Sequence, residues 1–233
     1  MLVVAVTASL ADMVDADTEH EEQRGTRGVF LALEGGEACG KSTQAQLLTQ
    51  WLRDCGLRVV LTREPGGTPA AEAIRTVVLS SDHDGLDGRV EALLFAAARG
   101  DHVQRVIRPA LDRGDIVITD RYIDSSIAYQ GYARGLDRDF IAELSAWVTE
   151  GLRPNLTIVL DLDPQMSHQR LRDKDRMESE EIAFHHAVRA GYLDLAAQDQ
   201  EAYLVVDASL PIGTIAAQIQ ERVKGLLVQS GVA

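Results

Sequence analysis

The chain has 233 residues, and its 36 acidic residues outnumber its 23 lysines and arginines, which gives a formal net charge of −13. This length allows one large α/β domain with a substantial core, and nothing demands a second domain. The acidic balance argues against a nucleic-acid binder or a membrane-surface binder, because phosphate backbones attract the opposite sign. Any nucleotide site must therefore be a local basic pocket. Two cysteines are too few for a disulfide framework and suit a reducing cytosol, so we expect a cytoplasmic protein.

The first residues carry an apolar stretch without the signals of export. No basic segment precedes it, acidic residues follow directly at Asp12, Asp15 and Asp17, and the stretch is too short to span a bilayer. Residues 1–27 show no core-forming period. We predict a flexible N-terminal extension at 1–27 and one folded domain at 28–228.

From residue 29 onward, apolar β-type runs alternate with stretches of helical spacing. Strands are predicted at 29–33, 58–62, 115–119, 156–161 and 203–206. Helices are predicted at 41–54, 69–79, 89–112, 137–150, 164–172, 179–198 and 211–228. Near-continuous Val/Ile/Leu strands between helices indicate an α/β fold with a five-stranded parallel sheet covered on both faces by helices, which makes three layers. Ligands of such sheets bind at the carboxyl ends of the strands.

The first strand ends in a glycine-rich loop that fits the phosphate-binding pattern G-x-x-x-x-G-K-[ST]. The residues predicted to hold ATP are Gly35, Gly36, Glu37, Ala38, Cys39, Gly40, Lys41, Ser42 and Thr43. Glycines let the backbone approach a phosphate, and successive N–H groups form an anion nest at the start of the next helix. Lys41 would reach the β- and γ-phosphates, and the Ser42 hydroxyl would ligate Mg²⁺. The alternative is a plain turn, but the strand before and the helix after favour the phosphate site. Together with the parallel sheet, this loop predicts the three-layer P-loop NTPase fold.

Two further strand ends carry charged side chains. The second strand ends at Arg63, beside a turn of Pro65 and two glycines, and the third ends at Asp120 and Arg121. In enzymes with this phosphate loop, an aspartate at the end of an apolar strand is the usual partner of Mg²⁺. Ser42 and Asp120 are therefore the predicted metal ligands. Either arginine by itself is also compatible with a surface salt bridge.

With these features in place, five blocks in order make the chain resemble the thymidylate kinase family of nucleoside monophosphate kinases. The resemblance runs from about Gly28 to Leu227. The blocks begin at Phe30 (FLALEGGE), Thr62 (TREPGGT), Leu94 (LFAAAR), Asp120 (DRYIDSSIAYQG) and Asp175 (DRME, with Phe184 and RAGY at 189–192). The resemblance implies transfer of the γ-phosphoryl group of ATP, with Mg²⁺, to dTMP. The products would be dTDP and ADP, a step in dTTP biosynthesis.

The resemblance also assigns roles at the acceptor. Phe95 would stack on the thymine ring, and Arg99 would lie along the base edge. Arg63 and Arg121 would grip the 5′-phosphate, while Glu37 would approach the 3′-hydroxyl or the phosphate region.

Three further residues of the fourth block belong to the same implied site. Ser126 and Gln130 would lie near the base, and Tyr129 would pack where a ribose 2′-hydroxyl would need space. From the residues alone, plainer interpretations stay open. Phe95 and Tyr129 would also suit core packing, and the two polar side chains would suit caps or solvent contacts.

No general base is needed, because the acceptor is an already ionised phosphate oxygen. In the family, arginines that stabilise the transferring group come either from the loop or from a lid. In this chain Ala38 occupies the loop position at which one subclass of the family carries an arginine. We therefore expect the lid, at about 168–178, to supply the arginines. The basic run comprises Arg170, Arg172, Lys174 and Arg176, of which Arg176 and Arg172 are the predicted catalytic residues beside Lys41 and Arg121. The alternative is a solvated helix face paired with neighbouring aspartates.

The resemblance further implies a homodimer, through the helices around 89–112 and 137–150. Three other functions are alternatives. A catalytically dead relative that serves as a scaffold is disfavoured, because Lys41, Ser42, Asp120, Arg63 and Arg121 are intact. Another mononucleotide or deoxynucleoside kinase would share the loop and the lid. A GTPase-like switch is disfavoured, because residues 82–85 (DHDG) match D-x-x-G away from any strand end and no Asn-Lys-x-Asp sequence is present.

Overall fold

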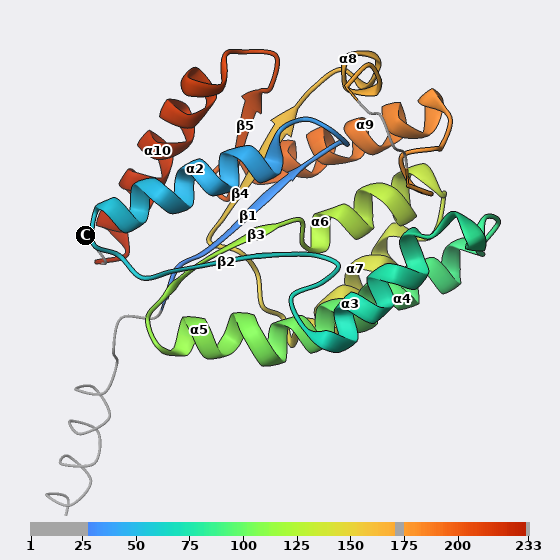
Figure 1. Cartoon of the computed structure of the whole chain (residues 1–233), viewed down its shortest axis with the longest axis horizontal. Coiled ribbons are helices and arrows are strands. Elements are labelled where there is room, and N and C mark those ends of the chain that lie inside the picture. The colour runs from blue at the N-terminus through green and yellow to red at the C-terminus, as the bar shows by residue number, and fades with distance from the viewer. Residues whose placement is uncertain (1–27, 171–174, 232–233) are drawn as a thin grey trace, which may run out of the picture.

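The computed structural model describes residues 28–170 and 175–231, which form a three-layer α/β fold with a parallel sheet between two layers of helices (Figure 1). The sheet has five parallel strands in the order β2-β3-β1-β4-β5. The strands are β1 (Phe30–Gly35), β2 (Val59–Arg63), β3 (Ile116–Asp120), β4 (Leu156–Asp161) and β5 (Tyr203–Asp207). The predicted five-stranded parallel sheet flanked by helices is confirmed.

Helices of very different length connect these strands. The α-helices are α2 (Lys41–Asp54), α3 (Pro69–Leu79), α4 (Gly88–His102), α5 (Arg108–Asp112), α6 (Ile123–Ser126), α7 (Arg138–Thr149), α8 (Pro164–His168), α9 (Ile182–Gln198) and α10 (Ile212–Gln229). A 3₁₀ turn, η1 (Ser81–His83), and two π-helical segments, η2 (Val103–Ile107) and η3 (Ile127–Ala133), complete them.

The two faces of the sheet are covered because side chains of a strand point alternately to opposite sides. On β1, Leu31 and Leu33 pack in a core beneath α2 and α10. Phe30 and Ala32 pack on the other face, with residues of α4, α5, α6 and α7. Helix α9 covers that second face beside β4. Double coverage explains why the central strands read as continuous apolar runs.

The helix boundaries differ from the expectation in several places. Helix α8 spans Pro164–His168 against the predicted 164–172, and α9 begins at Ile182 against the predicted 179. The predicted helix 89–112 is three consecutive segments. The π-helical segment η2 ends two residues before Pro109, whose nitrogen cannot donate to a regular helical ladder. The helical stretch from Ile123 to Ala133 was not predicted as an element. It is rich in Ser, Gly and Tyr, so its intrinsic helix preference is weak and its formation depends on packing.

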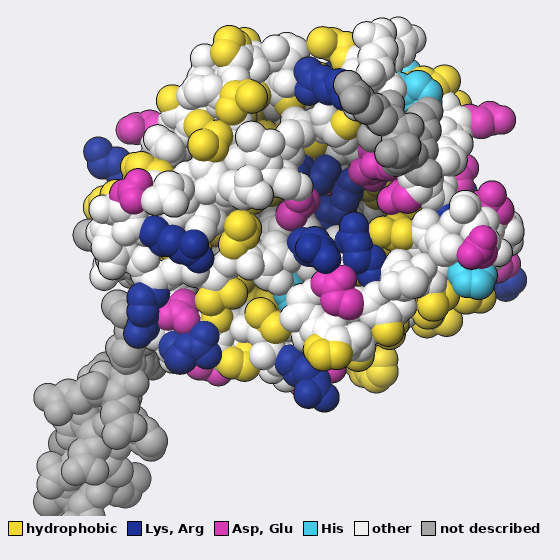
Figure 2. All heavy atoms as spheres, in the orientation of Figure 1, with side chains coloured by type: hydrophobic (Ala, Val, Ile, Leu, Met, Phe, Trp, Pro, Cys, Tyr) yellow, Lys and Arg dark blue, Asp and Glu magenta, His cyan; other side chains and the backbone are white. Residues whose placement is uncertain are grey.

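The strands direct all their carboxyl ends to one edge of the sheet. Figure 2 shows a hollow near the middle of this side of the molecule, between α9 and α3, where Lys/Arg and Asp/Glu side chains gather. The cations that a phosphate site in an acidic protein requires thus gather here together with carboxylates. In the part of the chain that the structure describes, no helix is both long and apolar enough to cross a bilayer.

Candidate active site

The loop between β1 and α2 has the backbone of a phosphate cradle. Gly35 and Gly40 have φ values of 137° and 98°, which disfavour any residue with a Cβ. A Cβ on Gly35 would lie 2.5 Å from the Leu160 carbonyl oxygen, so the neighbouring strand also excludes a side chain there. The loop leads directly into the first turn of α2, where unpaired N–H groups favour an anion.

Lys41 and Ser42 lie where the loop meets helix α2. Lys41 Nζ donates to the carbonyl oxygens of Gly36 at 2.6 Å and Gly35 at 3.2 Å, and it lies 3.6 Å from Cys39 Sγ. Ser42 Oγ donates to Asp120 Oδ2 at 2.6 Å, so the two predicted metal ligands lie side by side. The buried Cys39 fills the turn beneath the loop.

A cavity opens above these groups at the strand ends. Its described lining is Glu37, Ala38, Gly40, Lys41, Ser42, Thr43, Arg63, Glu64, Arg75, Asp120, Arg121 and Glu178. We call it the phosphate cavity. It collects residues from the loop, from the ends of β2 and β3, and from α3.

Arg121 lies at the inner wall of the phosphate cavity in a left-handed conformation, with φ of 74°. Its guanidinium group donates to Glu37 Oε1 at 2.6 Å, to Gly35 O at 3.0 Å and to Tyr129 OH at 3.2 Å. Burial alone would raise the pKa of Glu37, but the charges of Arg121 and Lys41 outweigh it and lower that pKa to about 2. The cavity therefore holds an ionised carboxylate beside its cations.

A second carboxylate, that of Glu34, is linked to Arg121 through two hydroxyl groups. Glu34 is fully buried and accepts hydrogen bonds from Ser125 N (3.2 Å), Ser125 Oγ (2.7 Å) and Tyr192 OH (3.0 Å). Because both hydroxyl groups donate to Glu34, their oxygens remain free to accept from Arg121 Nη1, at 3.3 and 3.2 Å. Burial raises the pKa of Glu34 above its ordinary value.

A second cavity adjoins the first, and we call it the acceptor pocket. Its described lining is Glu37, Glu64, Pro65, Arg75, Leu79, Phe95, Arg99, Arg121, Tyr122, Ser125, Ser126, Tyr129, Gln130, Asp175, Met177 and Glu178. Phe95, Arg99, Ser126, Tyr129 and Gln130, which come from α4, α6 and η3, converge here. The two cavities share Glu37, Glu64, Arg75, Arg121 and Glu178, so they meet at Arg121.

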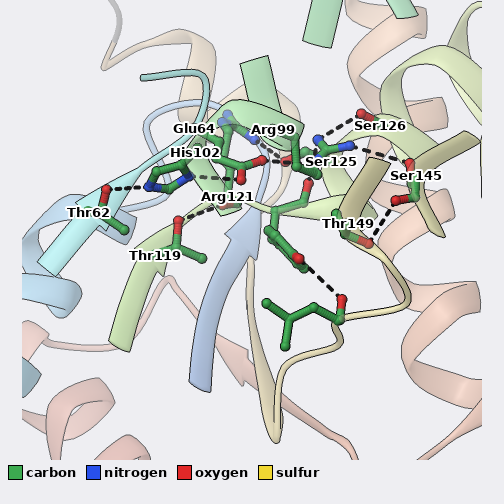
Figure 3. A network of polar contacts seen from close by, with 12 residues as sticks. Thr62, Glu64, Arg99, His102, Thr119, Arg121, Ser125, Ser126, Ser145 and Thr149 are labelled. Atoms are coloured by element: carbon green, nitrogen blue, oxygen red, sulfur yellow. Dashed lines mark hydrogen bonds and ion pairs between the residues drawn. The ribbon is translucent and has the colours of Figure 1, made fainter. Parts of the chain in front are cut away.

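A buried polar network holds Arg99 in place (Figure 3). Arg99 Nε donates to Glu64 Oε2 at 2.7 Å, and Nη2 donates to Ser126 Oγ at 2.9 Å. The other Glu64 oxygen lies 3.0 Å from His102 Nδ1, and His102 Nε2 lies 2.7 Å from Thr62 Oγ1. The network therefore joins the end of β2 to the wall of the acceptor pocket.

Arg63 behaves differently from Arg121. Its Nη2 contacts both carboxylate oxygens of Glu72 at 3.1 Å, and its side chain is 55% exposed. It lines the phosphate cavity, but it is absent from the described lining of the acceptor pocket. In this structure Glu72 is the partner of Arg63, and a bound phosphate would compete with Glu72 for its guanidinium group.

Comparison with known proteins places this site in a family. A family model described as Thymidylate kinase matches residues 33–219. A thymidylate kinase of Leifsonia xyli is 53% identical over 85% of this chain and 95% of its own length. One of Clavibacter michiganensis is 51% identical over 86% and 96%. The chain belongs to the thymidylate kinase family. The crystal structure of thymidylate kinase from Ehrlichia chaffeensis matches with a TM-score of 0.70 and 32% identity, over 85% of this chain and 99% of that one.

The family and the P-loop NTPase fold expected from the sequence are thus confirmed for this thymidylate kinase family member. Arg176 is buried: its Nε donates to Val78 O at 2.9 Å and its Nη2 to Glu91 Oε2 at 2.7 Å. Among the described residues, the lining of neither cavity includes it. In this structure the guanidinium group of Arg176 therefore pairs with groups of the protein, and its catalytic role in the lid stays a prediction. Arg172 lies outside the described residues.

The structure brings two arginines to the site that were not predicted as site residues from the sequence. Arg170 Nη1 reaches back to the carbonyl oxygen of Ala38, at 3.4 Å, beside the phosphate loop. Arg75 lines both cavities, is partly buried and donates to Pro65 O at 2.9 Å. Arg170 was already part of the basic run. Arg75 could have been found from its place on the first turns of the helix after the Pro-Gly-Gly segment.

Proposed function

We propose that this protein transfers the γ-phosphoryl group of ATP to dTMP. A 5′-phosphate oxygen of dTMP attacks the γ-phosphorus, the bond from the γ-phosphorus to the β–γ bridging oxygen breaks, and ADP leaves with that oxygen. The observation that supports this most directly is the meeting of the phosphate cavity and the acceptor pocket at Arg121. An acceptor bound in one and a triphosphate bound in the other would approach each other there.

In this proposal the donor is held by the loop from Gly35 to Thr43, with Lys41 turning from the Gly36 carbonyl oxygen toward the β- and γ-phosphates. Mg²⁺ would be held by Ser42 and Asp120. Their oxygens lie together on the exposed side of the loop, and Mg²⁺ prefers one or two protein oxygens with water and phosphate oxygens completing its shell. Bound there, the ion would neutralise charge on the transferring group.

The acceptor would lie with its base between Phe95, Arg99, Ser126 and Gln130, since these side chains line one pocket. Its 5′-phosphate would meet Arg121 and Arg75, with Arg63 released from Glu72 to assist. We place the sugar near Tyr129 and Glu37, whose carboxylate would accept from the 3′-hydroxyl.

Arg170 is the described lid residue that we propose to act on the transferring group, because it already contacts the loop at Ala38. We further propose a cytoplasmic homodimer. Helices α4 and α7 pack side by side and present the exposed apolar side chains Val90, Leu93, Phe140 and Trp147.

A coupled ADP-release assay tests the reaction. With ATP and Mg²⁺, dTMP should be turned over faster than dUMP, UMP, CMP, AMP or GMP. Lys41→Ala and Arg121→Ala should each lower kcat/KM at least about 100-fold, because each removes charge stabilisation at the transferring group. Lys224→Ala, on the exposed face of α10, serves as the control and should leave the rate unchanged. Preference for another monophosphate would contradict the assigned acceptor.

A further inference from the structure

Gln130 lies in the acceptor pocket with one end of its amide already occupied. Its side chain is 1% exposed and its Nε2 donates to Glu91 Oε1 at 2.8 Å. Within residues 28–170 and 175–231, no protein group donates a hydrogen bond to Gln130 Oε1. That oxygen is therefore available to whatever enters the pocket.

Glu91 is a fully buried carboxylate on α4 surrounded by donors. Arg176 Nη2 donates to its Oε2 at 2.7 Å, and Arg134 donates from Nη2 at 3.2 Å and from Nε at 3.3 Å. Arg134 in turn pairs with Glu180 at 2.5 Å. Glu91 thus joins α4, η3 and the segment before α9, and two guanidinium groups compensate its burial.

A carboxylate accepts hydrogen bonds and has none to donate, so it dictates which end of a neighbouring amide faces it. Glu91 can be satisfied only by the NH₂ end of Gln130. The carbonyl end of Gln130 must then point away from Glu91, as an acceptor available to the pocket. The orientation of this amide is fixed by a residue whose other partners are two arginines.

We propose that Glu91 is a specificity-determining positioning residue, which selects pyrimidines that carry a hydrogen on N3 by holding the Gln130 amide with its oxygen toward the base. Thymine and uracil present an N3–H donor to this oxygen. Cytosine presents an unprotonated N3, and two acceptors would face each other without a hydrogen. The inference rests on the proposed acceptor site, and it adds the atom that would be recognised and the residue that enforces it.

Replacement of Glu91 by glutamine separates this role from simple packing. Arg134 and Arg176 would take the single carbonyl oxygen of the new amide, leaving its NH₂ to face Gln130. Gln130 would then turn its own oxygen toward residue 91 and its NH₂ into the pocket, where cytosine N3 can accept. Binding a base that leaves a buried polar group without a partner costs free energy. The effect of the substitution on the selectivity between thymine and cytosine should therefore be large.

The measurement is kcat/KM for dTMP, dUMP and dCMP in the same preparation, with ATP and Mg²⁺. In Glu91→Gln the ratio of dTMP to dCMP should fall at least tenfold. The ratio of dTMP to dUMP should stay within twofold, because both bases carry the same N3–H. Each ratio is independent of the fraction of folded enzyme, so lost stability alone moves neither. An unchanged dTMP to dCMP ratio would overturn the proposal.

Two variants complete the design. Arg134→Gln removes a partner of Glu91 without touching Gln130, and it should keep the wild-type selectivity. Should Glu91→Gln fail to fold, Gln130→Met tests the same claim with Glu91 and both arginines still paired. Its dTMP to dCMP ratio should also fall at least tenfold, and wild-type rejection of dCMP in this variant would refute the proposal. If the wild-type protein did not phosphorylate dTMP at all, that result would instead contradict the proposed function itself.

Discussion

At the scale of single residues, the ion pair between Glu37 and Arg121 joins the loop to the end of β3. The two side chains are 17% and 16% exposed, and their atoms approach to 2.6 Å. Such a pair in partial burial is little screened by salt, and leaving one partner alone is costly. The pair therefore contributes to stability as well as to the site.

The pH dependence of unfolding tests this. The pKa of Glu37 is lowered from 4.5 to about 2, against the effect of burial, by Arg121 and Lys41. A lowered carboxylate pKa stabilises the folded state fully above the unfolded-state value, and this contribution is lost as the pH falls from about 4.5 through 2. Between pH 5 and 2 the wild type should lose about 3 kcal/mol more unfolding free energy than Glu37→Gln.

Chemical denaturation at a series of pH values gives the two curves. The variant should be less stable than the wild type at pH 7, where Arg121 lacks its partner, and the curves should converge in acid. Glu221→Gln, on the exposed face of α10, should follow the wild-type curve. Parallel curves for Glu37→Gln and the wild type would show that the pair adds no stability.

At the scale of elements, the turn between β2 and α3 is fitted to the buried network behind the acceptor pocket. Gly67 has φ of 83°, and a Cβ built there would lie 2.6 Å from His102 Cδ2. His102 holds Glu64, which holds Arg99. A side chain at position 67 should therefore disturb base recognition as well as the turn.

We predict that Gly67→Ala costs about 2–5 kcal/mol of stability, by combining left-handed strain of about 1–2 kcal/mol with overpacking of about 1–3 kcal/mol. It should also raise KM for dTMP several-fold. Gly85→Ala is the matched control, because Gly85 has φ of 84° and open space around its Cβ position. It should lose about 1 kcal/mol with KM unchanged. Equal effects at the two glycines would show that contact with His102 is unimportant.

At the scale of the whole molecule, the proposed dimer gives the exposed apolar side chains of α4 and α7 a role. Trp147 is 78% exposed and Phe140 is 58% exposed, one heptad apart on α7. Aromatic side chains of this size at the surface are typical of interface centres.

Light scattering after size-exclusion chromatography should give twice the chain mass of 25.4 kDa for the wild type. Trp147→Asp and Phe140→Asp should each shift the protein toward the monomer, because a charge would be buried in the interface. Val228→Asp alters an exposed apolar residue on α10 and should leave the mass unchanged. A wild type with the mass of one chain would refute the dimer.

Much of the site could be predicted because some of its residues are neighbours in the sequence, so that local backbone geometry places them. The glycines of the phosphate loop, Lys41 and Ser42 follow one another in the chain, so their spacing fixes their arrangement. Asp120 could be placed beside Ser42 because parallel strands present their ends at one edge. The arginines were harder, since a long side chain at a strand end can turn to a phosphate or to a carboxylate, as Arg63 does to Glu72.

The sequence by itself determined the sheet, the phosphate loop and the family, because hydrophobic periodicity and short motifs encode contacts between near neighbours. Only the tertiary structure decided which partners the charged side chains take. Arg176 is neutralised by Glu91, 85 positions away, and Gln130 is oriented by the same carboxylate across 39 positions. No local pattern carries such pairings, because a buried charge is satisfied by whichever element the fold brings against it.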